Sequence, residues 1–406
     1  MSMASRAVMM DFPLCADPRR DQAIRPVVER AVTFLLDRVG ADRIEAVILT
    51  GSLSRGEGSV VLGDDGARLL GDAEFLVVWK APFNWPDVRR RTAELGRQAT
   101  RELGCDGRVA SIEYGPSDLL YLQRNIRPCI FAYDLLHHGK VVWGRADILT
   151  EVRPFGVVEI PPEDAVELIM NRMVELLMLE ETHRANDPGR EARAYHVVKI
   201  TLDLAGSALA FAGQYVSSYA ARAGRFASLL DSIPDLRAAL PNSNGLLEDL
   251  DWATRCKLAP TEDLLFRRDL QGLVAAISTW AKDLWLWETR QWFGRPAGRF
   301  MDLVDEYVGR EPRWRRVRGW AKFCLHPLRP PGALSPLKLA RFLLRASPQT
   351  LTYAAALLIF WSTMGERRPG YGDRAAALLP VRRAVNRNGV TAGEVGDLWH
   401  WLVRNN

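Results

Sequence analysis

The sequence predicts an α+β head, built as a small mixed sheet flanked by helices, followed by an all-α helical region. Three observations support this prediction. Short apolar, β-branched segments alternate with helical patterns over roughly the first 150 residues. The character changes at Pro161-Pro162, which precedes the acidic residues Glu163 and Asp164 that are typical of a helix start. Beyond that point almost every segment has helical spacing.

The head is predicted from alternating patterns along the chain. Apolar residues recur at helical spacing over 21–38, and a polar, Arg-rich helix is predicted over 86–103. Buried strands are predicted where short apolar runs occur, an edge strand where KVVW occurs, and a hairpin where two short runs flank a Gly-Asp-Asp-Gly turn. In chain order, the predicted strands are 45–50, 74–79, 109–114 and 140–143, and the hairpin arms 60–62 and 67–70 lie between the first two. The segment 118–136 is predicted to be partly helical.

The helical region is predicted to be long and interrupted by loops. The expected helices cover 165–181, 191–212, 215–222, 246–256 and 261–292, and the Pro-rich segment 326–336 is expected to be a loop or linker. The predicted domains are 1–158 for the head, 159–325 for a helical domain and 326–406 for a helical C-terminal extension.

Composition restricts the class of protein without naming it. The 406 residues are 48% hydrophobic and 25% charged, as in soluble globular proteins. A net charge of +5, supplied mainly by Arg, is compatible with phosphate-bearing ligands but does not demand a nucleic acid. Five cysteines without CxxC spacing and an N-terminus without a signal peptide predict a cytoplasmic protein. The sequence contains no HExxH, GxSxG or P-loop motif.

The first candidate site residues follow the strand predicted at 45–50. Gly51 lets the backbone approach a ligand closely, and Ser52 at a helix start offers a hydroxyl and N–H groups to a phosphate. Arg55 follows in the same LSRGEG segment. Taken alone, a plain turn is the commoner interpretation of Gly-Ser after a strand.

Three acidic residues form the second candidate feature. Asp72 and Glu74 are two positions apart at the start of an apolar strand, so their side chains point to the same face. Glu113 lies among apolar residues in the strand predicted at 109–114, and it can complete the cluster if the two strands are neighbours. Carboxylates repel one another unless a cation sits between them, and such oxygen ligands suit Mg²⁺ or Mn²⁺. The alternative is an exposed strand end with incidental acids.

This order of motifs resembles the DNA polymerase β-like nucleotidyltransferase superfamily. The resemblance rests on TGS, a spacer, DAEF and a third acid in a later strand, and it covers about residues 44–149. It departs from the usual pattern in the long spacer between Ser52 and Asp72, which we assign to the hairpin, and in having Glu at position 74.

The resemblance implies an Mg²⁺-dependent transfer of a nucleoside monophosphate from a nucleoside triphosphate to an acceptor hydroxyl. It implies that Asp72, Glu74 and Glu113 bind the metal ions, and that Gly51 and Ser52, with Arg55, hold the nucleotide phosphates. The acceptor is open: a small molecule, a protein side chain or another nucleotide. A catalytically weak nucleotide- or partner-binding module with the same fold is the alternative, and a membrane-peripheral assembly factor is a further one.

Two later segments have functional and structural interpretations. Lys199 shares a helical stripe with Asp203 and would contact the triphosphate, or would form an exposed Lys–Asp pair. The basic, Trp-rich stretch 310–322 would bind a polyanion, an RNA or anionic lipid, or would be a solvated helix face with Trp anchors; no motif supports nucleic acid binding. The apolar run 351–364 is too short to span a bilayer, which favours a buried helix, with peripheral membrane contact over 310–364 as the alternative.

Overall fold

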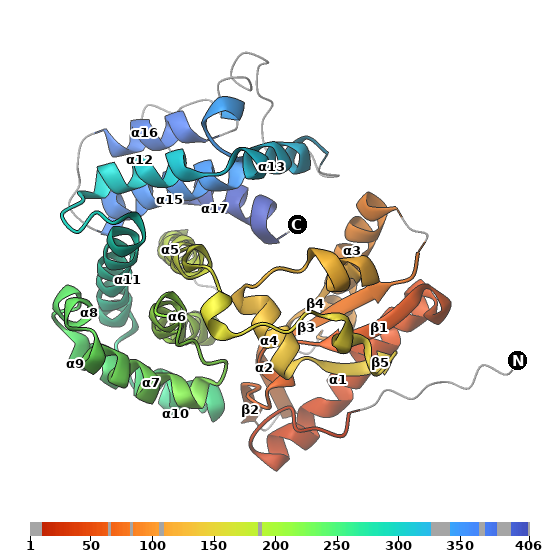
Figure 1. The fold of residues 1–406 in the computed structure, drawn as a ribbon. Helices are drawn as coiled ribbons and strands as arrows, with labels where there is room; N and C mark the ends of the chain where they lie inside the picture. The colour runs from red at the N-terminus through yellow and green to blue at the C-terminus, as the bar shows by residue number, and fades with distance from the viewer. Residues whose placement is uncertain are drawn as a thin grey trace, which may run out of the picture. The chain divides into compact units, whose positions relative to one another are not determined.

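The computed structural model describes residues 10–63, 66–81, 84–104, 109–185, 189–325, 342–364, 370–379 and 391–404. It is a mixed α/β structure with one sheet and many helices (Figure 1). The chain divides into two compact units, each assembled from three segments. Unit 1 comprises Met1–Asp164, Ala194–Ser228 and Leu247–Arg268, and unit 2 comprises Ala165–Arg193, Leu229–Leu246 and Asp269–Asn406. Compactness alone does not delimit folding domains, so the boundaries at 158 and 325 stay predictions.

The sheet of unit 1 is organised around its long third strand. Its five strands are β1 (Ile44–Leu49), β2 (Val60–Gly63), β3 (Gly66–Trp79), β4 (Val109–Asp118) and β5 (Lys140–Gly144). The order is β2-β3-β1-β5, and β4 also pairs with β3. The β3–β4 pair is parallel and the other pairs are antiparallel. The predicted combination of a small mixed sheet with a helical region is therefore confirmed.

The strand β3 is longer than the sequence predicted. The pattern indicated a hairpin arm at 67–70 and a separate strand at 74–79, whereas the structure has one strand of 14 residues. The residues between these segments remain extended because Asp72 and Ala73 pair with Ser111 and Ile112 of β4. Pairing with a distant strand therefore joins two segments that look separate in the local pattern.

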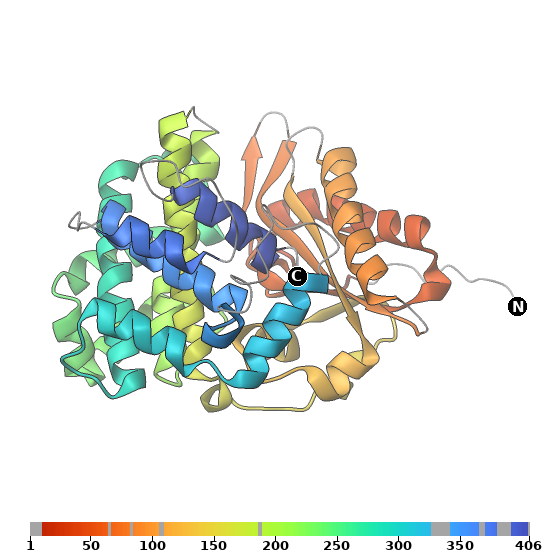
Figure 2. The same cartoon turned by 90° about the horizontal axis from the view of Figure 1, so that it is seen from above.

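The two faces of the sheet bury different elements. Helices α1 (Pro18–Val39) and α3 (Trp85–Leu103) cover one face, and Figure 2 shows both helices on that side of the strands. The core there includes Phe75 and Val77 of β3. A smaller cluster on the other face joins strand residues to the following elements. These are the π-helical segment η2 (Tyr121–Asn125), α4 (Ile130–His138) and the 3-10 segment η3 (Ile148–Glu151).

Further helices belong to unit 1. Most of α6 (Arg190–Phe211) and α9 (Ser243–Leu258), the first part of α7 (Tyr219–Ser232) and all of α10 (Glu262–Leu265) lie in its segments. The single helix predicted over 261–292 is divided into α10 and α11 (Leu270–Phe293). The division follows from local capping, because the Asp269 carboxylate accepts hydrogen bonds from the backbone N–H groups of Gln271 and Gly272 and starts a new helix.

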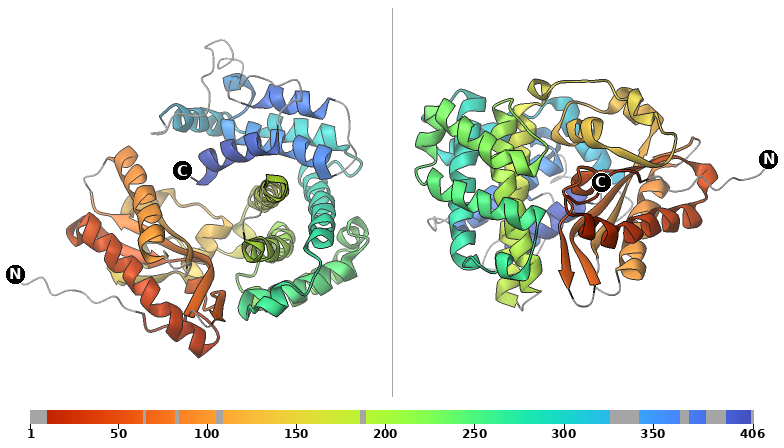
Figure 3. Two further views of the ribbon diagram at one scale, coloured as in Figure 1. Left: turned by 180° about the vertical axis from the view of Figure 1, so that it is seen from behind. Right: turned by 90° about the horizontal axis from the view of Figure 1, so that it is seen from below.

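Unit 2 is helical in the residues that the structure describes. Its main helices are α5 (Pro162–Ala185, from Ala165), α8 (Pro234–Ala239), α11, α12 (Phe300–Arg310), α13 (Arg313–Leu325), α15 (Pro348–Met364), α16 (Tyr371–Leu378) and α17 (Ala392–Trp399). Helix α15 packs against α12, α13, α16 and α17, and Figure 3 shows several of these helices alongside it. The predicted loop 326–336 lies outside the described residues.

The apolar segment at 351–364 lies in α15, and it is buried over 351–360, as the sequence predicted for most of its length. The side chains from Thr350 to Phe360 are buried in the structure. Among the helices in the described ranges, none combines the length and apolar character needed to cross a bilayer. The segment therefore contributes to the core of unit 2.

Candidate functional site

The turn after β1 brings the backbone of Gly51 against an acidic side chain. Gly51 has φ of +68°, and a Cβ atom built there would lie 2.3 Å from Oε2 of Glu74. The turn is tied to β3 because the Thr50 N–H donates to the Glu74 carbonyl at 2.9 Å. Helix α2 (Gly51–Ser54) is one turn long, so its dipole is small. Close backbone approach at Gly51 is therefore the main feature that this turn offers to a ligand.

Asp72 and Glu74 lie on the same face of β3. Both side chains are partly exposed, whereas Ala73 and Phe75 between and after them are buried in the core under α1 and α3. This alternation is what a strand geometry imposes. The predicted placement of the two carboxylates on one face is present.

The third carboxylate joins this face through the parallel pairing of β3 with β4. Glu74 is in register with Glu113, and Asp72 is in register with Ser111. The Ser111 hydroxyl donates to Oδ1 of Asp72 at 2.8 Å and lies 3.5 Å from Oε1 of Glu113. Ser111 was not predicted, although its position two residues before Glu113 in a strand places it on the same face.

Lys199 of α6 reaches the carboxylate face. Its Nζ donates to Oδ2 of Asp72 at 3.4 Å, and both side chains are partly exposed. The sequence predicted either a phosphate contact for Lys199 or a pair with Asp203. In the structure the Lys199 ammonium contacts Asp72 instead, and both residues belong to unit 1.

Arg55 is buried in a network of charged groups. Its guanidinium contacts Glu57 at 3.3 Å and Asp134 at 3.0 Å, and it lies over the ring of Tyr219. Because its hydrogen bonds are used within unit 1, Arg55 links the turn to α4 and α7. Its predicted role in binding a nucleotide stays a prediction.

The same network continues between α6 and α7. The buried Arg222 guanidinium donates to Asp203 at 3.0 Å and to the Tyr215 hydroxyl at 3.1 Å, and Tyr215 in turn donates to Asp134 at 3.1 Å. Burial raises the pKa of Tyr215, so its hydroxyl keeps its proton. This network was not predicted from the sequence. An acid at 134 within an apolar segment was one local signal for it, and Asp203 on the predicted helix 191–212 was another.

A buried lysine lies at the other end of this region. Lys257 of α9 is 2% exposed, donates to the Tyr195 hydroxyl at 2.8 Å, and lies over the rings of Tyr195 and Tyr219. Burial, together with the nearby cations Lys199 and Arg55, lowers the pKa of Lys257 to about 8. Tyr195 also donates to Ser59, and burial raises its pKa to about 12.

The carboxylate face suits a hard cation in its donor chemistry. Asp72, Glu74 and Glu113 supply oxygen ligands from neighbouring strands. Within the described ranges, however, no three His, Cys, Asp or Glu side chains converge closely enough to hold a metal ion as they stand. Lys199 and Ser111 compensate Asp72 in this arrangement. Metal binding by the three acids therefore stays a prediction.

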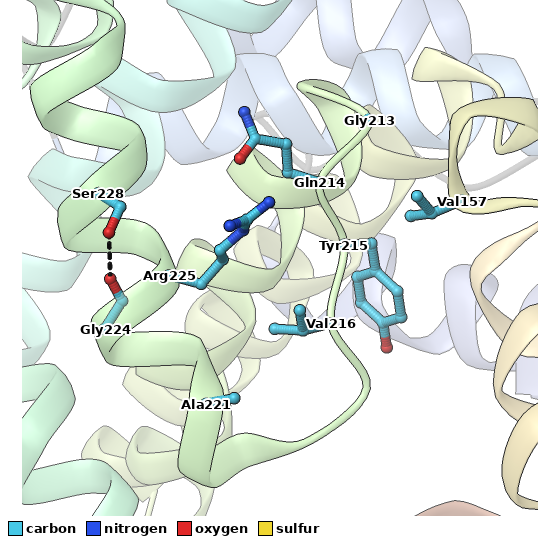
Figure 4. A pocket seen from close by; sticks show the side chains of 9 residues that line it. All are labelled: Val157, Gly213, Gln214, Tyr215, Val216, Ala221, Gly224, Arg225 and Ser228. Atoms are coloured by element: carbon cyan, nitrogen blue, oxygen red, sulfur yellow. Dashed lines mark hydrogen bonds between the residues drawn. The ribbon is translucent and has the colours of Figure 1, made fainter.

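A separate hollow of about 490 Å³ opens on unit 1 beside α7 (Figure 4). Figure 4 shows the Arg225 side chain extending toward Gln214, whereas the Tyr215 ring points away from Gln214. The described lining contains none of the seven predicted site residues; it consists of Val157, Gly213, Gln214, Tyr215, Val216, Ala221, Gly224, Arg225 and Ser228. Tyr215 connects this hollow to the buried network through Asp134.

The basic stretch 310–322 spans the end of α12 and most of α13. Trp320 is 2% exposed, as expected for a Trp anchor, whereas Trp314 is 47% exposed. The interpretation of this stretch as a solvated helix face with Trp anchors therefore fits Trp320 but not Trp314.

No protein-family model and no curated protein matches this chain.

Proposed function

We propose that unit 1 is a divalent-metal-dependent nucleotidyltransferase that moves a nucleoside monophosphate from a nucleoside triphosphate to an acceptor hydroxyl. The proposal rests on one observation above all. Asp72, Glu74 and Glu113 share a face of two register-paired parallel strands, and the Gly51 turn lies directly against Glu74. The order of these elements along the chain also agrees with the resemblance to the DNA polymerase β-like superfamily.

The three carboxylates are the residues that would hold Mg²⁺ or Mn²⁺. When bound, such an ion would orient the triphosphate and lower the pKa of the acceptor hydroxyl. Ser111 orients Asp72 by donating a hydrogen bond to Oδ1. The other carboxylate oxygen, Oδ2, accepts from Lys199. Glu113 is exposed, so the attacking hydroxyl could reach it and transfer its proton to it.

The turn and α6 supply the groups that would bind the triphosphate. Gly51 has no side chain to keep a phosphate oxygen away from the backbone, and Ser52 adds a hydroxyl donor. Lys199 places a positive charge beside Asp72, where it can also offset the charge of a phosphate group. Positioning and charge stabilisation would supply most of the rate acceleration.

A catalytically weak nucleotide-binding module is the second proposal, and the Lys199–Asp72 ion pair favours it. An ammonium 3.4 Å from Asp72 neutralises this carboxylate without a metal ion. A protein of this kind would bind a nucleoside triphosphate through the turn and Lys199, and binding would not require Mg²⁺.

Thermal unfolding with each of the four nucleoside triphosphates, with and without Mg²⁺ or Mn²⁺, tests both proposals. A ligand at 100 times its Kd stabilises the native state by about 2.7 kcal/mol, which is readily measured as a rise in Tm. For the enzyme we expect a rise that requires metal and is lost in Asp72→Asn/Glu74→Gln. Glu45→Gln is the matched control, because Glu45 is a partly exposed acid in β1 that was not assigned to the site.

Release of pyrophosphate separates the two proposals. With hydroxyl acceptors of several classes, the enzyme is expected to release pyrophosphate in the presence of Mg²⁺ or Mn²⁺, and the double variant is expected to release none. A metal-independent Tm rise without pyrophosphate would favour the binding module. If no nucleoside triphosphate changes Tm under any condition, both proposals are wrong.

A further inference from the structure

The outer side of α13 carries exposed apolar residues next to cations. Trp314 is 47% exposed and Val317 is 68% exposed, three residues apart and therefore on one side of the helix. Leu344, in the short helical segment 342–345, is 82% exposed. We call this surface the α13 patch; it consists of Arg313, Trp314, Val317, Arg318, Leu343 and Leu344, all in unit 2.

The α13 patch is fixed in place by hydrogen bonds on the inner side of the helix. Trp320 is buried and its indole N–H donates to the Ala346 carbonyl at 2.9 Å. Arg316 donates to the Leu344 carbonyl at 3.0 Å and to the carbonyls of Glu311 and Gly309. These bonds hold the backbone of residue 344 beside α13, so the exposed apolar side chains of the two segments belong to the same part of unit 2.

The charge of α13 is of one sign. Its 13 residues include five cations and no acid. Arg315 lies 3.8 Å from Glu167, and Arg316 is used in the carbonyl bonds described above. Arg313 and Arg318 form no ion pair with the residues that the structure describes, and both are exposed. The surface therefore complements an anionic partner.

We propose that the α13 patch binds the surface of an anionic lipid membrane without crossing it. Exposed aliphatic side chains favour lipid over a nucleic acid, because single-stranded nucleic acid is bound mainly by stacking on aromatic rings. Val317 and Leu344 would enter the boundary between headgroups and acyl chains, Trp314 would lie at the interface, and Arg313 and Arg318 would contact lipid phosphates. This proposal is independent of the function proposed for unit 1.

Co-sedimentation of the full-length protein with lipid vesicles tests the proposal. We expect binding to vesicles of phosphatidylcholine mixed with phosphatidylglycerol, weaker binding to pure phosphatidylcholine, and loss of binding at high salt. Removing the two cations in Arg313→Gln/Arg318→Gln should weaken partitioning about 25-fold, from about five-fold for each cation. Val317→Asp and Leu344→Asp should each weaken it by at least about ten-fold, since they remove an apolar contact and add a negative charge.

Two matched variants control for charge and for exposed apolar surface. Arg299→Gln removes an 87% exposed cation at the opposite end of α12 from α13, and Val158→Asp changes a 78% exposed valine in unit 1. Both should sediment nearly like the wild type, and circular dichroism should show that every variant is folded. The proposal is overturned if the wild type binds no vesicles, if the patch variants bind like the controls, or if a single-stranded RNA binds the patch while vesicles do not.

Discussion

Two regions of unit 1 are stabilised by different interactions. Between the sheet and helices α1 and α3, the interior is almost entirely apolar, with Phe75 and Val77 of β3 among its buried residues. Around α6, α7 and α9, the interior instead contains buried ionised and hydroxyl groups, including Arg222 and Asp203. The first region gains stability from burial in proportion to area, whereas the second must recover a large desolvation cost through its hydrogen bonds.

The difference shows why the predicted site lies where the two regions meet. The apolar side of β3 fixes the strand, and the opposite side of the same strand presents Asp72 and Glu74. Lys199 contacts this strand from α6, in the polar region. A strand can serve both purposes because its side chains alternate between faces.

The largest expected effect is in the apolar region. Phe75→Ala should lower the free energy of unfolding by about 3–5 kcal/mol, because Phe75 is 2% exposed and its removal leaves a cavity. Denaturation by urea measures the effect. Leu62→Ala is the control, since Leu62 is 45% exposed and should change stability by less than about 0.5 kcal/mol. Equal effects would mean that the apolar core does not carry the stability of the sheet.

In the polar region, breaking a pair should cost more than replacing it. Asp203→Ala leaves the buried Arg222 without one of its acceptors and should lower the free energy of unfolding by about 3 kcal/mol. The double variant Asp203→Leu/Arg222→Met should lie much closer to the wild type, because neither charge is then buried. The same urea denaturation applies; a double variant less stable than Asp203→Ala would show that the pair contributes net stability.

A smaller effect is expected at the turn between the regions. Gly51→Ala should cost about 1–2 kcal/mol because φ is positive, and its Cβ must displace the Glu74 carboxylate. Gly294→Ala is matched in φ, at +65°, with no atom within 4 Å of the new Cβ. Gly294→Ala should therefore lose only the part of this stability that comes from the positive φ, and loss of nucleotide-dependent Tm shifts is expected for Gly51→Ala alone. Retention of those shifts would remove Gly51 from the proposed site.

The smallest effect concerns the pH dependence that Lys257 brings to the polar region. Its folded pKa, about 8, is below the ordinary value of 10.5, so the unfolded chain binds more protons between these values. Stability should therefore rise as the pH increases above 8, by at most about 1.4 kcal/mol per unit. Lys257→Met should remove this rise when free energies of unfolding are compared at pH 7, 8 and 9. An unchanged slope in the variant would assign the pH dependence to other groups.

Much of the sheet could be predicted because its signals are local. The segments 45–50, 74–79 and 140–143 were identified from short β-branched runs, and they correspond to β1, the end of β3 and β5. Strand alternation also correctly placed Asp72 and Glu74 on one face. The continuity of β3 could not be predicted, because it depends on pairing with β4, about 40 residues away in the sequence.

The polar region could not be predicted for the same reason. Asp134 is joined to Arg55 and Ser217, which are 79 and 83 residues away along the chain. Helical periodicity indicates which residues share a face of the helix. It does not indicate which charged residue from elsewhere in the chain contacts that face. Lys257 illustrates the difficulty, since a lysine in the last turn of a helix is usually exposed and here is buried.

The Glu57 carboxylate links the turn after β1 to helix α7 by hydrogen bonds. It accepts hydrogen bonds from the Ser218 hydroxyl and from the backbone N–H groups of Tyr219 and Ala220 in the first turn of α7, while its own N–H donates to the Ser52 carbonyl. Ser52 and the start of α7 must therefore shift together or lose these bonds. Because α7 is about 21 Å long, a tilt at this end would displace the far end of the helix by more than its start.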